Sequence, residues 1–514
     1  MNASMARHNQ RIHDFVIIGA GSAGCVLAAR LSASGKHSVL LLEAGPDHPV
    51  DRLPPEIRSG WQPTSSHDWG YVGESGDGVP AIELWRGKLV GGCSATNATV
   101  ALRGRPADFD AWAALGNPGW AFDDVLPVFC SLENDFDFAG PWHGSDGPLP
   151  IRRYQPPEWV AGQAEFAEAC AAEGHDDAAD HNAPGAVGIG PVPVNTVDGL
   201  RRSTSLAYLA AARSRQNLTV RSEMLVDRIA LGAGRAVGVR LASTGETIAA
   251  HHVVLSAGAY GSPAILWRSG IGPAADLRAL GIAVRHDLPG VGDRLCDHPR
   301  MGMRFAAPRT ALGQPGPGCQ VLLTMASPGA RDGHDLHLFP WSISEAGDSP
   351  TGARFTLHVA LMTPLSRGRV RLRSPDPAVK PVIEVGWLSD GADLPRLLAG
   401  VRAARRLAAQ PSLAAIALRE LTPGPTAESD VELGASVRAN LGTYFHPVGT
   451  CAMGPVDDAA AVVDARGAVH GVEGLWVVDA SIMPTIPAAN TQLATIMLAE
   501  RCARSLETAL SNGD

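Results

Sequence analysis

Three glycines near the start of the chain have the spacing Gly19-x-Gly21-x-x-Gly24, between an apolar run at 14–18 and a small-residue, helix-like run at 22–31. At such a turn the first glycine permits the bend, the second lets a phosphate group approach the backbone, and the third allows close helix packing. The start of the helix also offers free N–H groups and partial positive charge. This pattern is suited to binding a pyrophosphate.

A second apolar run at 38–42 ends at Glu43, 24 residues after Gly19. Parallel strands joined by a right-handed crossover bring their ends to the same edge of a sheet, so we expect Glu43 to lie beside the glycine turn. A carboxylate there can accept both hydroxyls of an adenosine ribose and would repel a 2′-phosphate. The unit therefore predicts an adenine dinucleotide site and leaves FAD and NAD both open.

A candidate base lies near the other end of the chain, in the segment GTYFHPVGTCAMG at 442–454. His446 precedes a proline, which favours an extended backbone and makes the direction of the ring reproducible. A histidine with a near-neutral pKa is suited to accepting a proton, although one histidine among seventeen is as compatible with a structural role. Asn490 precedes a long apolar helix from Thr491 to about residue 510, where asparagine is also a common N-cap.

Two further segments are rich in small residues. RGKLVGGCSATNATVALRG at 86–104 contains Gly91 and Gly92, and SAGAYGSPAILWRSGIG at 256–272 follows a strand-like run. Adjacent glycines with small polar neighbours can lie close against a flat ligand, although double glycines in loops also form ordinary turns. An NAD enzyme that shared only the segment from Gly19 to Glu43 would leave both segments without a purpose.

Together these segments resemble the glucose–methanol–choline (GMC) oxidoreductase family of FAD enzymes, over nearly the whole chain. Residues 258–272 fit the second signature of that family throughout, and residues 87–110 fit the first except at Cys93 and Thr96. In some members a histidine at the position of Thr96 is joined covalently to the flavin. The resemblance therefore implies a non-covalent FAD here.

The resemblance also implies roles for individual residues. His446 would be the active-site base over the flavin, and Asn490 would face the substrate hydroxyl beside it. His446 would accept the alcohol proton while the carbinol carbon gives hydride to flavin N5, and O2 or another acceptor would then take the electrons. The positions expected at the cofactor are Gly19, Gly21, Ser22, Gly24, Glu43, Ala44, Arg86, Gly91, Gly92, Asn97, Val226 (through its backbone, at adenine), Ala257, Asp479 (by the phosphates or ribityl chain), Ala480 and Thr491.

Tyr444 and Phe445 flank the expected base, and Trp341 and His358 lie in strand-like segments. Aromatic side chains at such places can stack on a flat substrate, and they can equally belong to the core. Segments at 143–151, 271–282 and 479–491 look most like bacterial aryl-alcohol and 5-hydroxymethylfurfural oxidases. The resemblance thus favours oxidation of a primary alcohol on an aromatic or heteroaromatic ring to the aldehyde, with reoxidation by O2.

Other activities remain open at this point. A choline-type or aliphatic alcohol dehydrogenase with a non-oxygen acceptor would keep the same motifs, as would a hydroxynitrile lyase that cleaves cyanohydrins without net redox change. Choline would call for an aromatic cage or a buried acid, and the sequence places neither.

The order of elements predicts an α/β fold. We expect a Rossmann-like FAD-binding domain, with its parallel strands, and an α+β substrate domain, because alternating apolar and polar residues between Met301 and Arg373 are typical of an antiparallel sheet. The Gly-, Pro- and Trp-rich stretch at 46–150 predicts long ordered loops, and helices are expected at 203–214 and 393–409. The expected FAD-binding domain comprises 1–155, 195–300 and 440–514, and the substrate-binding domain comprises 156–194 and 301–439.

Composition excludes several classes of protein. The net charge of −9 comes without a basic stripe, so nucleic acid is not an expected partner. The eight cysteines are far apart with no zinc-ligand spacing, which predicts reduced thiols and no metal site. No apolar run approaches the roughly 18 to 20 residues of a membrane helix, and residues 1–13 lack the apolar region of a secretory signal. By elimination we expect a cytoplasmic protein, of unknown oligomeric state.

Overall fold

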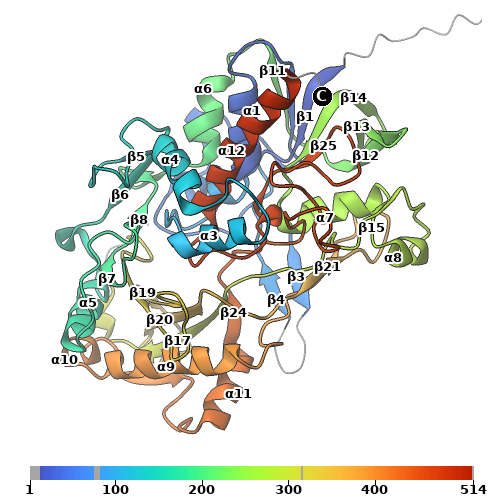
Figure 1. The fold of residues 1–514 in the computed structure, drawn as a ribbon. Helices are drawn as coiled ribbons and strands as arrows, with labels where there is room; N and C mark the ends of the chain where they lie inside the picture. The colour runs from blue at the N-terminus through green and yellow to red at the C-terminus, as the bar shows by residue number, and fades with distance from the viewer. Residues whose placement is uncertain (1–11, 75–80, 314–315, 512–514) are drawn as a thin grey trace, which may run out of the picture.

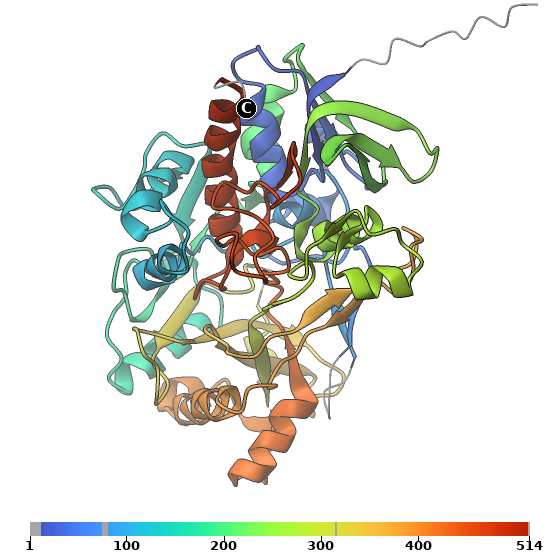
Figure 2. The same ribbon diagram turned by 45° about the vertical axis from the view of Figure 1, so that its right-hand side comes forward.

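The computed structural model describes residues 12–74, 81–313 and 316–511. Its two largest sheets each have seven strands, one mostly parallel and one antiparallel, and Figures 1 and 2 show them one above the other. The predicted mixed α/β class is therefore confirmed. The expectation of no secretory signal depends mostly on residues 1–11, which lie outside the described residues.

The first sheet is built on the short apolar runs of the sequence. β1 lies between two parallel neighbours, β2 and β14, and every residue from Phe15 to Ile18 is buried there. A strand buried on both faces reads as a continuous apolar run, as this one does. In order, the sheet comprises β11 (Leu218–Arg221), β2 (Val39–Leu42), β1 (His13–Ile18), β14 (Thr247–Leu255), β13 (Arg235–Leu241) and β12 (Val226–Gly232), with β25 (Leu475–Val477) also paired to β14.

The first and last helices of the chain lie side by side against this sheet (Figures 1 and 2). α1 (Ser22–Leu31) follows the glycine turn, and α12 (Thr491–Ser511) is the long C-terminal helix. Arg30 and Glu500 form an ion pair between them at 2.7 Å, and Ser22 Oγ donates to Gln492 Oε1. The two helices are thus joined near both ends of α1, and the contact of Ser22 with Gln492 lies at the edge of the sheet where ligands bind in this class of fold.

The second sheet shows the alternation expected of an antiparallel sheet with two different faces. In β20 the buried side chains of Phe355, Leu357 and Val359 share an apolar core with α9 (Asp393–Ala408), which lies below the sheet in Figure 1. The strands in order are β23 (Arg419–Thr422), β17 (Pro299–Ala306), β20 (Ala353–Leu361), β19 (Leu336–Glu345), β18 (Val321–Met325) and β7 (Gly188–Pro191), with β24 (Leu441–Thr443) also paired to β17.

Smaller sheets and helices connect these two layers. The small sheets are formed by β21 (Arg369–Arg371), β22 (Val382–Glu384), β3 (Tyr71–Glu74) and β4 (Ile82–Leu84); by β5 (Glu133–Asp135), β6 (Leu149–Arg153) and β8 (Pro193–Val194); by β9 (Thr196–Val197) and β10 (Leu200–Arg201); and by β15 (Ile271–Gly272) and β16 (His286–Asp287). The remaining helices are α2 (Pro55–Arg58), α3 (Pro106–Ala114), α4 (Phe122–Leu132), α5 (Gln163–Ala172), α6 (Ala210–Ala212), α7 (Gly258–Arg268), α8 (Ala274–Ala279), α10 (Pro411–Ala414) and α11 (Asp430–Asn440).

Three local predictions differ from the structure. The expected loops at 46–150 contain α3 and α4, which the density of Pro, Gly and Trp concealed. The expected helix at 203–214 is a π-helical turn at Ser205–Leu209 followed by one short α-turn, α6. The alternating residues at 367–373 do not extend the second sheet, because β21 pairs with β22 in a separate sheet.

No helix in the described ranges combines the length and apolar character needed to cross a membrane. The residue boundaries of the two domains stay a prediction.

Candidate active site

A continuous cavity runs from the glycine turn of the first sheet to the segment that contains His446. It has residues of both large sheets in its wall, including Ile18 of β1 and Arg300 of β17. Gly24 and Gly91 are predicted site residues that do not line it. The predicted residues that do are Gly19, Gly21, Ser22, Glu43, Ala44, Arg86, Gly92, Asn97, Val226, Ala257, Tyr444, Phe445, His446, Asp479, Ala480, Asn490 and Thr491.

Each glycine of the turn is required for a different reason. A Cβ on Gly19, which has a φ of +98°, would lie 2.5 Å from the carbonyl oxygen of Ser256, and one on Gly24 would lie 1.9 Å from that of Gly19. Gly24 therefore serves close helix packing behind the cavity. A Cβ on Gly21 would meet only Gly92 Cα, at 4.0 Å, so the backbone of Gly21 faces open space. An anion can approach the N-terminus of α1 there.

Glu43 lies beside this turn, as its position after β2 predicts. Its carboxylate accepts hydrogen bonds from the N–H groups of Ala20 and Gly45, both at 2.9 Å, and only 5% of the residue is exposed. Burial raises the pKa of the Glu43 carboxyl to about 7, although these N–H groups favour its charged form. Glu43 loses hydrogen bonds to water when it is buried. A hydroxyl that reaches its carboxylate through the cavity would replace one of them.

Asp479 lines the opposite wall at the end of β25. Its Oδ2 accepts hydrogen bonds from the N–H of Gly258 at 2.9 Å and from the Oγ of Ser262 at 2.6 Å, while its Oδ1 accepts from the N–H of Ser481. Gly258 has a φ of +77°, and a Cβ there would have no atom within 4 Å. Gly21 and Gly258 thus form an open cradle. With Glu43 and the start of α1, it has the donors and space that an adenine dinucleotide needs.

At the other end of the cavity the imidazole of His446 lies between two side chains. Asn490 Nδ2 is 3.1 Å from Nε2 of His446, and Nδ1 of His298 is 3.0 Å from its Nδ1. If the Asn490 amide donates to Nε2, the proton of the ring resides on Nδ1 and is donated to His298. Nε2 then carries the lone pair that accepts the hydrogen bond from Asn490.

The backbone of His446 is held by a buried carboxylate. Asp297 accepts a hydrogen bond from the N–H of His446 at 2.8 Å and another from the hydroxyl of Thr443. The preceding residue, Phe445, has a φ of +65°, which is uncommon for a bulky side chain. Its carbonyl accepts a hydrogen bond from Arg86 at 2.8 Å. These contacts fix the direction in which the imidazole enters the cavity.

The pKa of His446 is lowered well below its usual 6.5, first because the ring is buried and then because His298, Arg86 and Arg300 are near. The near-neutral value expected from the sequence is therefore wrong, since that expectation took no account of desolvation. The imidazole is neutral at physiological pH and able to accept a proton.

Sequence reasoning missed three residues at this end of the site, of which Arg300 lines the cavity and the other two contact His446 from behind the wall. Asp297, His298 and Arg300 all belong to the segment CDHPR at 296–300, where β17 begins. The sequence contains one indication of their importance, because His298 precedes a proline just as His446 does. Only the pairing of β17 with β24 shows that the two His-Pro segments lie together.

A cradle for an adenine dinucleotide that opens onto a neutral imidazole and an amide defines a flavin- or nicotinamide-dependent oxidoreductase. Residues 13–300 and 364–499 match the GMC oxidoreductase family, so the chain belongs to that family. It is an FAD-binding enzyme that acts on the CH–OH group of alcohols.

Similar proteins have different substrates in their names. The 5-(hydroxymethyl)furfural oxidase of Methylovorus sp. (strain MP688) is 39% identical, with 97% of this chain and 99% of that protein covered. The oxygen-dependent choline dehydrogenase of Ectopseudomonas mendocina (strain ymp) is 38% identical, covering 95% and 93%. A crystal structure of pyridoxine 4-oxidase from "Mesorbium loti" has a TM-score of 0.89 at 33% identity and covers 96% and 99%.

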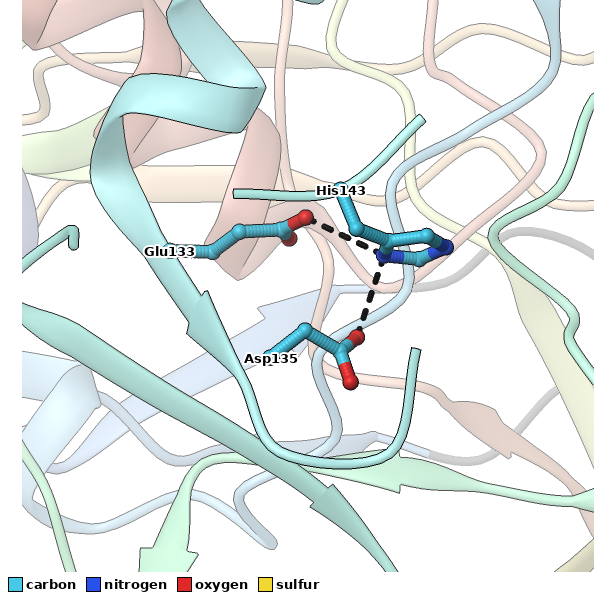
Figure 3. Close-up of side chains that lie close together, drawn as sticks. All are labelled: Glu133, Asp135 and His143. Atoms are coloured by element: carbon cyan, nitrogen blue, oxygen red, sulfur yellow. Dashed lines mark hydrogen bonds and ion pairs between the residues drawn. The ribbon is translucent and has the colours of Figure 1, made fainter. Parts of the chain in front are cut away.

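A second group of titratable side chains lies outside the cavity. Glu133, Asp135 and His143 are close enough for their ligand atoms to surround a cation, and Figure 3 shows both carboxylates directed at Nδ1 of the histidine. The other ring nitrogen of His143 lies 2.8 Å from a carboxylate oxygen of Asp180. Both nitrogens thus face acids, which requires both to carry protons.

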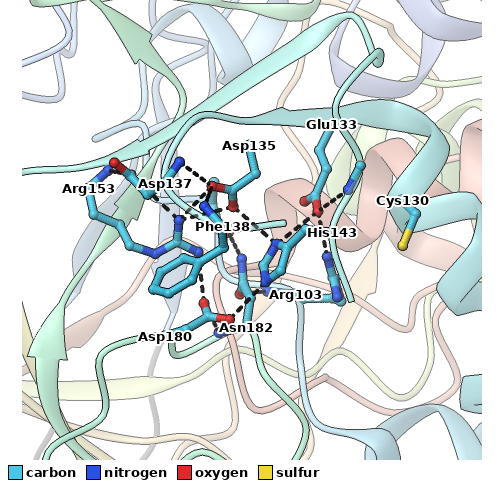
Figure 4. Close-up of polar contacts among 12 residues, drawn as sticks. Arg103, Cys130, Glu133, Asp135, Asp137, Phe138, His143, Arg153, Asp180 and Asn182 are labelled. Carbon is cyan, nitrogen blue, oxygen red and sulfur yellow. Dashed lines mark hydrogen bonds and ion pairs between the residues drawn. The ribbon is translucent and has the colours of Figure 1, made fainter. Parts of the chain in front are cut away.

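This group is an internally balanced network of ion pairs (Figure 4). Arg103 pairs with Glu133 at 2.8 Å, and Arg153 pairs with Asp135 at 2.9 Å and with Asp180 at 2.7 Å. The carboxylates raise the pKa of His143 to about 11, although burial opposes them. The protonated histidine and the two guanidinium groups balance the three carboxylates, so the network joins β5, β6 and the loop at Asp180 through ion pairs.

Replacing His143 by Gln should destabilise the protein by about 3 kcal/mol, because removing one partner from a buried ion pair leaves charge uncompensated. Urea unfolding at neutral pH measures the effect. Since the folded pKa of His143 is raised, its contribution should be complete below pH 6.5 and should disappear as the pH rises through about 11. Asp146→Asn changes an exposed residue of the same loop and is the matched control. Equal stability of the two variants would contradict this role.

Replacing Glu43 by Gln should weaken FAD binding by ten- to a hundredfold, since hydrogen bonds to a charged group are worth roughly 1.5 to 3 kcal/mol. The ratio of flavin to protein after gel filtration gives a first measure, and titration of the apoprotein with FAD gives the dissociation constant. Glu223→Gln, an exposed acid of a neighbouring loop, should retain the cofactor. Undiminished FAD binding by the Glu43 variant would show that this carboxylate does not hold the ribose.

Proposed function

We propose that this enzyme oxidises a primary alcohol on an aromatic or heteroaromatic ring to the aldehyde, with O2 as the electron acceptor. The observation that carries the proposal is the pair formed by His446 and Asn490 at the end of a cavity continuous with the dinucleotide cradle. The similarity to a 5-(hydroxymethyl)furfural oxidase supports the ring and the acceptor.

In this proposal FAD, held between Gly21, Glu43 and Gly258, supplies the group that accepts a hydride from the carbinol carbon. The alcohol proton goes to Nε2 of His446, which exchanges its hydrogen bond from Asn490 for one from the substrate hydroxyl. The Asn490 amide N–H can then donate to the alcohol oxygen while the hydroxyl donates its single proton to Nε2.

The surroundings of this pair assist the transfer in two ways. Thr491 places the start of α12 in the wall of the cavity, and the partial positive charge of a helix N-terminus stabilises negative charge that develops nearby. In the tautomer with the proton on Nδ1, His298 accepts the hydrogen bond from that nitrogen and keeps the imidazole in one orientation. Orientation and fixed dipoles in a desolvated site supply much of an enzyme's acceleration.

The walls around the alcohol end favour a flat substrate. Tyr444, Phe445, Trp341 and Trp85 line the cavity, with Trp85 and Phe445 stacked at 5.4 Å and 13°. Such walls bind an aromatic or furan ring by stacking. Among the described residues that line this end of the cavity, the charged side chains are Arg86 and Arg300, so a choline-like cation finds no carboxylate there.

Anaerobic addition of benzyl alcohol or 5-(hydroxymethyl)furfural to the holoenzyme should bleach the flavin, and admission of air should restore the colour with formation of hydrogen peroxide. Absorbance spectroscopy and a peroxide assay measure both steps. Bleaching that air does not reverse would reject O2 as the acceptor. A spectrum left unchanged by every alcohol, together with cyanohydrin cleavage, would indicate a lyase.

Replacing His446 by Ala should slow flavin reduction by about a hundredfold or more, because general-base catalysis contributes typically 10²–10⁴-fold, while FAD stays bound. In the unaltered enzyme the rate should stay constant as the pH falls to about 6.5 and decrease only well below it, since the pKa of His446 is lowered. Stopped-flow absorbance measures both. His251→Ala, at an exposed histidine, is the control. An unaltered rate in the His446 variant would remove this residue from the mechanism.

A further inference from the structure

Arg300 is a half-buried cation in the wall of the active site. It lies near the start of β17, in register with Ala360 of β20 and Gly442 of β24, so its backbone is held from both sides. The side chain lines the cavity, and its Cζ is 5.9 Å from the centre of the Tyr444 ring.

The guanidinium of Arg300 has no hydrogen bond and no ion pair to any residue in the ranges that the structure covers. The acids in the wall of the cavity are Glu43 and Asp479, both at the dinucleotide end and both engaged with backbone N–H groups. Asp297 is near in sequence, but its two oxygens accept from His446 and Thr443. The centre of the Tyr444 ring lies 5.9 Å from Cζ of Arg300, and the charge of Asp297 acts on the guanidinium without an ion pair between them.

Two arginines of this protein that are more fully buried are paired with carboxylates. Arg103 and Arg153 are each 1% exposed, and each is bonded to at least one carboxylate in the ion-pair network. A buried charge without a partner costs free energy, and arginine does not relieve that cost by losing its proton at neutral pH. An unpaired guanidinium that faces an active-site cavity therefore points to an anion supplied by a ligand.

We propose that Arg300 binds a carboxylate on the substrate, so that the preferred alcohols are hydroxymethyl-aryl or hydroxymethyl-furan carboxylates. This inference rests on the proposed oxidation of ring-bearing primary alcohols. The planar fork of a guanidinium matches a carboxylate through two parallel N–H···O bonds, which fixes both position and orientation.

The geometry also gives the spacing between the two ends of such a substrate. The Tyr444 ring lies 4.4 Å from the His446 imidazole, centre to centre, and 5.9 Å from Cζ of Arg300. Because Tyr444 contacts both groups and all three line the cavity, a substrate whose hydroxymethyl group lies at His446 can have a carboxylate within reach of Arg300. The same positive charge opposes a quaternary ammonium group and thus selects against choline.

The test compares acidic and neutral alcohols on the holoenzyme. For the unaltered enzyme, kcat/KM for 4-(hydroxymethyl)benzoate should exceed that for its methyl ester. In Arg300→Met this ratio should fall at least tenfold, Arg300→Lys should restore part of it, and Arg300→Glu should lower it further. Arg304→Met, an exposed arginine of the same strand, should keep the ratio of the unaltered enzyme.

A binding measurement separates this inference from the proposed reaction. Benzoate, which is not oxidised, should perturb the flavin spectrum and bind at least tenfold more weakly to Arg300→Met than to the unaltered enzyme. Equal benzoate affinity and an equal substrate ratio in the two proteins would overturn the role of Arg300, even if benzyl alcohol still bleached the flavin. If no alcohol bleached the flavin, the proposed function would fail, and arginine-dependent benzoate binding would still support an anion site.

Discussion

The whole active site depends on backbone packed directly against backbone at the glycine turn. A Cβ on Gly92 would lie 2.6 Å from Gly21 Cα, and one on Gly19 would lie 2.5 Å from the Ser256 carbonyl oxygen. The N–H of Gly91 donates to the carbonyl of Ala20 at 2.7 Å. Three segments that are distant in sequence meet here without side chains between them. Any side chain inserted at these contacts would separate the cradle from the loop that carries Arg86 and thus from Phe445 and the base.

Burial determines the protonation and the ion pairing of the titratable side chains around this packed backbone. In the network around His143 each buried cation faces carboxylates, and the result is structural cohesion. In the cavity, burial keeps His446 neutral. Arg300 has no ion pair with a carboxylate there and contacts the Tyr444 ring, so a ligand with a negative charge can supply the missing partner. Position relative to the cavity, and not residue type, separates these two outcomes.

Much of the frame could be predicted because its signals are local. Short sequence patterns predict the position of the glycine turn, of Glu43 and of the strands β1 and β2. His446 and Asn490 are predicted from motifs that resemble a known family. Asp297, His298 and Arg300 could not be assigned in this way, because their importance arises from the pairing of β17 with β24, about 140 residues later. The pKa of His446 depends on burial, which no spacing in the sequence records. The helices α3 and α4 were hidden because aromatic, proline and glycine residues obscure a helical period.

The packing of α1 against α12 has a consequence for how the enzyme is made. The cavity wall contains residues from Ile18 to Thr495, so a nascent chain cannot enclose the cofactor until α12 has left the ribosome. At ~5–20 residues per second, translation from Ile18 to Thr495 takes on the order of one minute, during which the early strand–turn–helix unit exists without the helix that packs against it. Enclosure of the cofactor therefore follows the synthesis of α12 and coincides with the docking of this helix against α1.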